Sequence, residues 1–276
     1  MAEGAKGTAT DVYVLDTGEA GAKRLALLDK VYGPSTRAML LDAGLDEGMR
    51  VLDLACGIGA VCCWMATQVG PGGSVVAADV NPDQLVVSKW HCAKCEHLPI
   101  DYVEASAYAT GFPDASFDLA HIRLLLCHLT EPEKVLREIY RVLKPGGALV
   151  CQDLLISTIF CSPRCAAYER FLELGQETGR ILGVDYNFGA RLPAAALDAG
   201  FHSIDVRLAQ PAYLAGPEKR LWEYTFAEVT AVMLRDNAAR ATQDELEELL
   251  REMAEFAADE RTLIAQACLP GVIARK

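Results

Sequence analysis

The sequence lacks the features that would assign it to a membrane, secreted or nucleic-acid-binding class. It has no apolar run near the roughly 20 residues that a bilayer-spanning helix needs. Residues 1–7 show neither the basic nor the apolar region of a signal peptide. Lys and Arg number 26 against 38 Asp and Glu, and the resulting net charge of −12 repels a phosphate backbone. We therefore expect a cytoplasmic protein that binds neither a membrane nor nucleic acid.

Ten cysteines are many for a chain of 276 residues, yet neither a disulfide framework nor a metal site follows from them. In a reducing compartment we expect thiols, most of them small core residues in a chain that is 51% hydrophobic. Residues 91–97, with two His around a Cys-x-x-Cys pair, look like half of a zinc site. A structural zinc usually takes a second pair, and Cys161 with Cys165 has a looser spacing. We therefore expect no metal.

Predicted strands and helices alternate from residue 51 to residue 153. Short apolar runs predict the strands, and amphipathic stretches between them predict the helices. Such alternation implies an α/β fold with a doubly wound parallel sheet, which binds its ligand at the carboxyl ends of the strands. Thr130 and Glu133 form a capping-box pattern at the start of the last helix. The predicted strands are 51–55, 74–78, 101–104, 117–122 and 148–153, and the helices are 61–69, 82–94 and 130–143.

The flanking segments are predicted to be mainly helical. Two helices are expected before Gly44, a residue typical of a helix end. Of the later helices, the last has an N-cap pattern in Thr242 and Glu245. The predicted elements are two helices in 13–43, helices at 168–182 and 192–199, a strand at 203–208, two helices between 217 and 261, and a strand at 268–274.

The turn after the first strand indicates which class of ligand the protein binds. Gly57 and Gly59 match the first two positions of the dinucleotide-binding fingerprint, but Cys62 stands at the third. Asp53 lies just before the loop, where a pyrophosphate would need backbone amides. An anion there disfavours phosphate and suits a ligand with a cation, such as the ammonium and sulfonium of S-adenosylmethionine. Asp79, at the end of the second strand, is placed to accept hydrogen bonds from two ribose hydroxyls.

Four segments in order resemble the class I S-adenosylmethionine-dependent methyltransferases. Val51–Gly59 is similar to the first motif of that family and Ala78–Pro82 to its second-strand acid, while Phe112–Asp118 and Arg141–Gly147 resemble two further segments. The resemblance implies a mostly parallel, seven-stranded, Rossmann-like sheet with a helical cap, and S-adenosylmethionine as the cofactor. It divides the chain into an N-terminal helical lid (1–44), a cofactor-binding core (45–154), and the rest of the sheet (155–276) with cap insertions at about 155–190 and 217–261.

The resemblance also assigns cofactor-binding roles. The turn backbone would hold the methionine part, and the second-strand acid with the two residues after it would hold ribose and adenine. The family usually has an Asp after the third strand for the adenine amino group, but here Ser106 stands there, and an uncharged acceptor is weaker. Arg123 is a candidate for the cofactor carboxylate or a substrate anion. The predicted cofactor residues are Asp53, Ala55, Cys56, Gly57, Gly59, Asp79, Val80, Asn81, Ser106, Ala107, Tyr108 and Arg123.

Candidate catalytic residues are few, because methyl transfer from a sulfonium depends mainly on holding the acceptor in line. A base is needed where the acceptor is a hydroxyl or a protonated amine. His128 stands where the family often has a His beside the substrate, and Tyr13 lies in a segment that resembles the lid of natural-product methyltransferases. Asp153 ends the fifth strand and suits a base and a loop cap equally. His121, within the fourth strand, is expected to be a buried structural residue.

The predicted cap is rich in aromatic residues, which suit a lipophilic or aromatic small molecule of specialised metabolism or a quinone pathway. The acceptor atom, whether O, N or C, stays open, and so does a homodimer. The alternative is a protein that binds the same cofactor without transferring a methyl group, as a cyclase, a rearrangement catalyst or a ligand-binding module. The candidate substrate residues are Tyr13, His128, Asp153, Tyr186 and Trp222.

Overall fold

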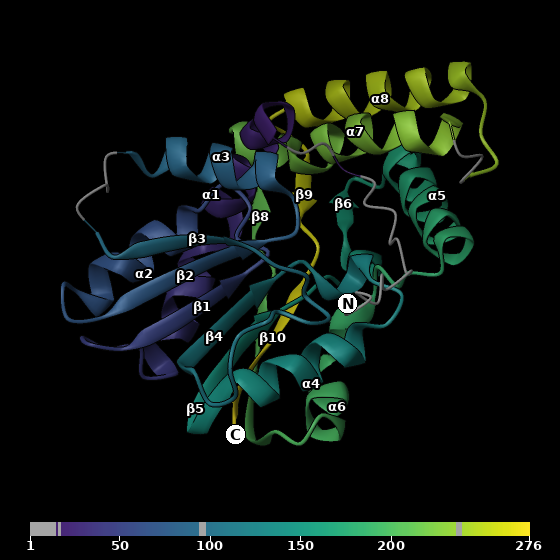
Figure 1. Cartoon of the computed structure of the whole chain (residues 1–276). Coiled ribbons are helices and arrows are strands. Elements are labelled where there is room, and N and C mark those ends of the chain that lie inside the picture. The colour runs from purple at the N-terminus through teal and green to yellow at the C-terminus, as the bar shows by residue number, and fades with distance from the viewer. Residues whose placement is uncertain (1–14, 16–17, 94–97, 236–238) are drawn as a thin grey trace, which may run out of the picture.

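The computed structural model describes residues 15, 18–93, 98–235 and 239–276, which form a seven-stranded sheet, a three-stranded sheet and helices (Figure 1). The large sheet has the order β3-β2-β1-β4-β5-β10-β7. Its first five strands are parallel, and β10 is antiparallel to both of its neighbours. The strands are β1 (Arg50–Leu54), β2 (Ser74–Asp79), β3 (Ile100–Glu104), β4 (Phe117–Arg123), β5 (Leu143–Gln152), β7 (His202–Ala209) and β10 (Leu269–Arg275).

This arrangement confirms the predicted doubly wound, mostly parallel seven-stranded sheet. Alternate side chains of β1 enter two separate hydrophobic clusters, Val51 in one and Leu52 in the other, so both faces of the sheet are covered. The carboxyl ends of β1, β2, β3, β4 and β5 therefore meet at one edge. The helices are α1 (Gly18–Asp42), α2 (Ala60–Val69), α3 (Pro82–His91), α4 (Pro132–Val142), α5 (Ala166–Leu182), α6 (Leu192–Asp198), α7 (Leu221–Arg235) and α8 (Gln243–Ala258).

The N-terminal segment corrects one prediction, because it forms a single helix instead of two. Helix α1 continues through Pro34 to Asp42. Two polar contacts hold it in place: the Tyr32 hydroxyl donates to the Ala267 carbonyl, between β9 and β10, at 2.8 Å, and the Thr36 hydroxyl donates to the Gln152 side chain of β5 at 2.6 Å. These tertiary contacts outweigh the helix-breaking tendency of proline.

Two capping predictions have opposite outcomes. Thr242 is the N-cap of α8, and its hydroxyl accepts a hydrogen bond from the Glu245 amide at 3.2 Å, as predicted. At α4 the N-cap is Glu131 without a side-chain cap, so the capping box from Thr130 to Glu133 was wrong. Pro132 takes the first helical position there, where its missing N–H leaves one fewer donor to satisfy.

The small sheet has the order β6-β9-β8 and was not predicted. Its strands have only two or three residues, too few to show an alternating pattern. Because β8 and β9 flank α7 and α8, the insertion at 217–261 lies between short strands instead of joining β7 directly to β10. The strands are β6 (Phe160–Ser162), β8 (Ala212–Tyr213) and β9 (Leu263–Ala265).

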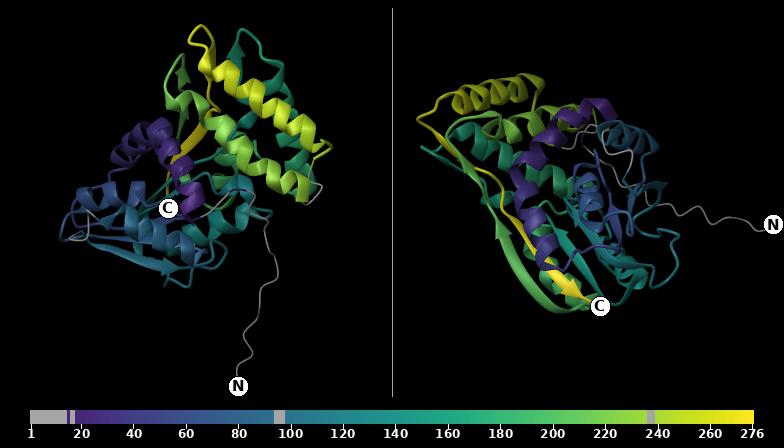
Figure 2. Two further views of the ribbon diagram at one scale, coloured as in Figure 1. Left: turned by 90° about the horizontal axis from the view of Figure 1, so that it is seen from above. Right: turned by 90° about the vertical axis from the view of Figure 1, so that its left-hand side faces the viewer.

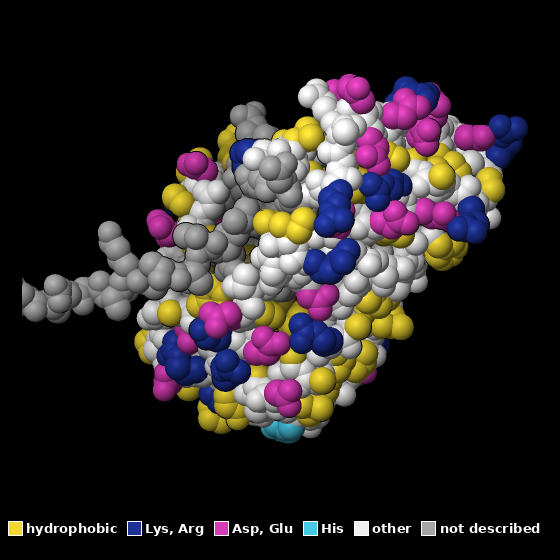
Figure 3. Space-filling view, turned by 90° about the vertical axis from the view of Figure 1, so that its right-hand side faces the viewer, with side chains coloured by type: hydrophobic (Ala, Val, Ile, Leu, Met, Phe, Trp, Pro, Cys, Tyr) yellow, Lys and Arg dark blue, Asp and Glu magenta, His cyan; other side chains and the backbone are white. Residues whose placement is uncertain are grey.

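Helices α5, α7 and α8 pack together as a cap beside α1 (Figure 2). Aromatic contacts join them: the ring centroids of Phe171 and Phe226 are 5.0 Å apart, and those of Tyr168 and Phe256 are 6.0 Å apart. On the face in Figure 3, acidic and basic side chains are interspersed over the cap. One ion pair, Arg170 with Glu245, joins α5 to α8. This mixture is typical of a solvated surface.

The cysteines follow the prediction with one exception. Eight of those in the described part of the chain are free thiols, but Cys63 is disulfide-bonded, so the expectation of thiols throughout was wrong there. Part of the predicted zinc-like segment, residues 94–97, lies outside the described residues. Within the described ranges no group of three or more metal-ligating side chains occurs, and no helix is long and apolar enough to cross a membrane.

Candidate active site

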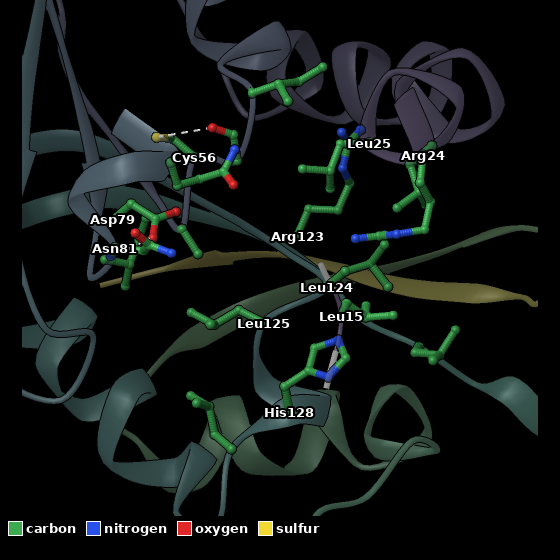
Figure 4. Close-up of a pocket in the computed structure, with 18 of the residues that line it drawn as sticks. Leu15, Arg24, Leu25, Cys56, Asp79, Asn81, Arg123, Leu124, Leu125 and His128 are labelled. Atoms are coloured by element: carbon green, nitrogen blue, oxygen red, sulfur yellow. Dashed lines mark hydrogen bonds between the residues drawn. The ribbon is translucent and has the colours of Figure 1, made fainter. Parts of the chain in front are cut away.

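One cavity of about 570 Å³ lies between the carboxyl edge of the large sheet and helices α1, α5 and α7. Figure 4 shows its two ends: Asp79 and Asn81 lie at one side, and Arg24 and His128 at the other. Most of the predicted site residues line it. These are Asp53, Ala55, Cys56, Gly57, Asp79, Val80, Asn81, Ser106, Ala107, Tyr108, Arg123, His128, Tyr186 and Trp222.

The turn between β1 and α2 is built by backbone conformation. Ala55 and Gly57 both have left-handed backbones, with φ of 59° and 57°. A left-handed Ala is uncommon, and its strain is typical of functional turns. The Cys56 amide donates to the Ala78 carbonyl at 3.1 Å, which ties the turn to the end of β2. This geometry turns the chain sharply at the edge of the cavity.

Gly59 does not line the cavity, so the structure assigns it to packing. It also has a left-handed backbone, with φ of 76°. A Cβ at this position would overlap the Ser88 hydroxyl and lie 2.9 Å from the Cys92 sulfur. Glycine is needed here because α3 packs directly against the turn.

Asp79 presents a half-buried carboxylate at the end of β2. Its Oδ1 accepts a hydrogen bond from the Asn81 amide at 3.0 Å. Burial raises the pKa of Asp79, while hydrogen bonds from the Asn81, Gly57 and Val80 amides act in the opposite direction. In the described ranges no cation pairs with this carboxylate, so it can accept further hydrogen bonds from a ligand. Beside it, the Val80 side chain is exposed and offers an apolar surface.

After β3, the chain turns back at residues 106–109. The Ser106 hydroxyl accepts a hydrogen bond from the Tyr108 amide at 3.3 Å, and the Ala109 amide donates to the Ser106 carbonyl. The turn brings Ser106, Ala107 and Tyr108 to the same end of the cavity as Asp79. Since the Ser106 hydroxyl already accepts one hydrogen bond, its proton remains available for another acceptor.

Asp53 is less available than the sequence predicts. It is 2% exposed; its Oδ1 lies 2.6 Å from His121 Nδ1, and its Oδ2 accepts from the Cys62 thiol at 2.8 Å. A carboxylate only accepts hydrogen bonds, so Nδ1 carries the proton in this pair. His121 Nε2 has no hydrogen-bond partner in the described residues, although His121 lines the cavity. The pair therefore presents a histidine, and not a free carboxylate, to the ligand.

Arg123 is anchored to α1. Its guanidinium donates to the Thr36 hydroxyl at 3.0 Å and to Asp29 at 3.3 Å. Asp29 also pairs with Arg37. Arg123 thus joins the end of β4 to α1, and Asp29 balances its charge. Arg123 also lines the cavity.

His128 lies in a short 3₁₀ helix after β4 and packs against Tyr186, with ring centroids 5.6 Å apart. Burial lowers the pKa of His128 to about 4, and the positive charge of Arg24 adds to this effect. The ring is therefore neutral at neutral pH. A neutral imidazole keeps one nitrogen able to accept a proton or a hydrogen bond.

Asp153 was a candidate base and substrate residue, and the structure corrects this in favour of the loop cap. It does not line the cavity. Its carboxylate accepts hydrogen bonds from the amides of Leu126 and Leu154, both at 2.7 Å, and of Cys127 at 3.3 Å. Burial raises its pKa to about 6. Asp153 therefore fixes the 3₁₀ helix that carries His128.

The cap supplies the apolar wall. Trp222 from α7 is 5% exposed and packs near Phe171 of α5, with ring centroids 6.2 Å apart. Tyr186 closes the wall next to His128. Tyr13 lies outside the described residues, but Leu15 lines the cavity at the same end as His128 (Figure 4).

Sequence reasoning missed Arg24. This residue of α1 lines the cavity and pairs with Glu228 of α7, with 2.7 Å between Nε and Oε2. The two positions are 204 residues apart, and a charged residue at a helix position carries no local sign that it turns inward. The apolar residues 25–28 that follow it are the one sign in the sequence that this face of α1 is buried.

Three comparisons with known proteins are informative. Residues 52–151 match the family described as methyltransferase domain. The ubiquinone/menaquinone biosynthesis C-methyltransferase UbiE of Escherichia fergusonii is 35% identical over 178 residues, which cover 59% of this chain and 70% of that protein. The Bacillus halodurans protein BH2331 shares the fold over 87% of this chain and 98% of its own, with a TM-score of 0.60 and 22% identity. The [4+2]-cyclase SpnF shares it over 97% and 99%, with a TM-score of 0.58 and 20% identity.

Proposed function

The chain belongs to the class I S-adenosylmethionine-dependent methyltransferases, and from that premise we propose that it methylates an O, N or C atom of a lipophilic or aromatic small molecule in a biosynthetic pathway. The observation that carries the proposal is the continuity of the cavity. One end has the strand ends and the glycine turn, and the other has the apolar cap wall. Cofactor and acceptor can thus meet in a single continuous cavity.

The cofactor end suits S-adenosylmethionine. Asp79 has a half-buried carboxylate with unused acceptor capacity, as two ribose hydroxyls require. Exposed Val80 and the turn at Ser106 to Tyr108 suit an adenine ring, and the backbone of Ala55 to Gly57 suits the methionine part. When bound, this cofactor supplies an electrophilic methyl group on a sulfonium. We assign His121 Nε2, oriented by Asp53, and Arg123 to the polar groups of the methionine part.

At the acceptor end, the residues chiefly position the substrate and exclude water. Phe171, Tyr186 and Trp222 form an apolar wall, where a poorly solvated nucleophile reacts faster. His128 is neutral and holds a proton weakly, because its pKa is about 4. Such a ring nitrogen orients an acceptor through a hydrogen bond better than it removes a proton from a weakly acidic hydroxyl. This supports a methyl acceptor that is already ionised or that reacts through a carbon atom. The Escherichia fergusonii relative is likewise named a C-methyltransferase.

We assign α1 and α7 to a lid that closes over this site. We also propose that the enzyme is cytoplasmic, has no nucleic-acid or membrane partner, and is compatible with a homodimer. The two helices are joined across the cavity by Arg24 and Glu228. If they close on ligands, their amides should gain protection from hydrogen exchange when S-adenosylhomocysteine and an acceptor bind, while β1 and β4 should change little. Equal exchange with and without ligands would remove the lid but leave the methyltransferase assignment.

The deciding experiment measures S-adenosylhomocysteine release. The protein is incubated with S-adenosylmethionine and a panel of naphthols, quinols and aromatic carboxylic acids, and the product is quantified by mass spectrometry. We expect acceptor-dependent release together with a mass gain of one methyl group on the acceptor. A protein that uses the cofactor without methyl transfer would bind it and release no S-adenosylhomocysteine with any acceptor.

A further inference from the structure

Arg24 is a buried cation at the acceptor end of the cavity. It is 3% exposed, and its Nε donates to Glu228. Its Nη2 is buried and has no hydrogen-bond partner in the part of the chain that the structure describes. Buried donors without a partner are rare in folded proteins, and a charged one is the least favourable kind. We therefore expect Nη2 to gain a partner when a ligand enters the cavity.

The neighbouring charges leave this position open to an anion. Arg123, the other arginine among the described residues that line the cavity, is held by Asp29 and Thr36 and is assigned above to the methionine part of the cofactor. Asp79 lies at the opposite end of the cavity (Figure 4). His128, which faces Arg24, is neutral near pH 7 because burial lowers its pKa. Glu228 engages Nε, so the guanidinium keeps a fixed orientation with Nη2 available.

A second buried donor lines the same cavity. The indole N–H of Trp222 has no hydrogen-bond partner in the described ranges, although Trp222 is almost fully buried in α7. The acceptor end therefore combines an apolar wall with two unsatisfied N–H donors. Such a surface recognises a molecule with an apolar body and oxygen acceptors.

We propose that Arg24 binds a carboxylate of the methyl acceptor, so that the substrate is a lipophilic carboxylic acid instead of a neutral lipophile. This inference rests on the proposed function, because it names the substrate class of the same site. A guanidinium binds carboxylates through directed, charge-assisted hydrogen bonds, which Lys reproduces only as a point charge. Because Arg24 of α1 pairs with Glu228 of α7, binding of the carboxylate would affect both helices.

The test uses a matched pair of probes, 2-naphthoic acid and 2-naphthalenemethanol, titrated by calorimetry into the full chain saturated with S-adenosylhomocysteine. The two probes share an aromatic body and differ in the anionic group. We expect the acid to bind at least about 10-fold more tightly, since one hydrogen bond to a charged group accounts for a factor of this size. Equal binding of the two probes, or no binding of the acid at 1 mM, would overturn the proposal.

Variants then identify the residue responsible. R24M should abolish the preference for the acid, and R24K should retain only part of it. Because R24M leaves Glu228 without its partner, R24M/E228Q removes both charges and guards against a folding defect. K23M is the matched control: Lys23 is an exposed cation one residue earlier, over the Tyr224 ring, and does not line the cavity.

The two proposals can fail separately. A preference for the acid that survives in R24M/E228Q, with S-adenosylhomocysteine affinity unchanged, would refute the carboxylate site while methyl transfer could still be observed. Conversely, an Arg24-dependent preference in a protein that methylates no member of the acceptor panel would refute the methyltransferase proposal and leave the anion site. E228Q alone should increase the preference for the acid, because it removes the competing anion.

Discussion

The two ends of the cavity are built differently. At the proposed cofactor end, most of the lining residues lie within residues 53–108, in turns directly after β1, β2 and β3, and His121 and Arg123 of β4 complete it. At the acceptor end, the lining side chains come from α1, the 3₁₀ helix at His128, α5 and α7, and the ion pair of Arg24 with Glu228 joins positions 204 residues apart. The first end depends on local backbone geometry, whereas the second depends on the packing of distant helices.

This difference indicates how the protein can vary. Backbone turns such as the one at Ala55 and Gly57 require particular residues, so the cofactor end tolerates little change. The acceptor end can exchange one side chain for another on a helix surface and so accept a different substrate. The following predictions test whether the two ends are as separable as this comparison suggests.

The largest effect is expected beneath the acceptor end, where Asp153 fixes the 3₁₀ helix that carries His128. Asp153→Ala removes the acceptor for the Leu126, Cys127 and Leu154 amides and leaves them unsatisfied. At roughly 1 kcal/mol or more for each bond, the free energy of unfolding should fall by about 3 kcal/mol, measured by urea denaturation. Asp205→Ala, at an exposed carboxylate paired with Arg207, is the control and should change it by less than about 0.5 kcal/mol. Equal effects in the two variants would contradict the capping role.

At the cofactor end, Asp79→Ala should weaken binding of S-adenosylhomocysteine by about 10- to 100-fold, because the carboxylate's hydrogen bonds to ribose are lost. The KM for the acceptor should stay nearly constant. Calorimetry measures the first quantity and initial rates the second. Asp83→Ala, in the first turn of α3 and outside the cavity lining, should bind the cofactor like wild type. A dissociation constant unchanged in folded Asp79→Ala would show that Asp79 does not bind ribose.

His128 should produce a pH-dependent loss of stability. Its pKa is about 4 in the folded protein and about 6.5 when unfolded, so the unfolded state binds more protons between these values. Stability from this residue therefore falls as the pH decreases from about 6.5 to 4, by about 2 kcal/mol at pH 5 relative to pH 7. His128→Asn should lack this loss, whereas His202→Asn, on the exposed edge strand, should keep it. The check is urea denaturation at both pH values, and parallel curves for wild type and His128→Asn would refute it.

The smallest effect concerns the wall. Trp222→Phe keeps most of the ring volume but removes the unpartnered N–H. The KM for a substrate whose oxygen accepts a hydrogen bond from this N–H should therefore rise about 5-fold. Affinity for S-adenosylhomocysteine should not change. Trp90→Phe, at an exposed position on α3, should affect neither quantity. If Trp222→Phe weakened the cofactor instead, the two ends would not be separable.

The same comparison explains what the sequence could reveal. The glycine turn and the acid were recognisable because each adjoins a predicted strand, Gly57 shortly after β1 and Asp79 at the end of β2, whereas the pairing of Asp53 with His121 was not foreseen. The fold was predictable for the same reason, since alternating apolar runs fix a parallel sheet. The predictions erred where tertiary contacts decide: α1 stays continuous through Pro34 because it is bound to the sheet, and Asp153 turns its carboxylate to backbone amides.

Arg24 is the clearest case of information that the sequence does not carry. An arginine in a helix is usually solvated, and only the packing of α7 against α1 buries it with Glu228. Likewise, nothing in the sequence distinguishes Gly59, which makes room for α3, from Gly57, which lines the cavity. The sequence pattern predicted the glycine turn but not which glycine lines the cavity and which one allows close packing.

The position of β10 constrains the order in which the protein can be assembled during synthesis. Residues 269–275 lie between β5 and β7 in the sheet, pairing Val272 with Cys151 on one side and with Val206 on the other. Until they leave the ribosome, the edge of β5 is open and β7 has no neighbour in the sheet. The nascent chain therefore presents an unpaired, apolar strand edge, the kind of surface that chaperones cover, and the sheet closes only after translation has passed residue 275.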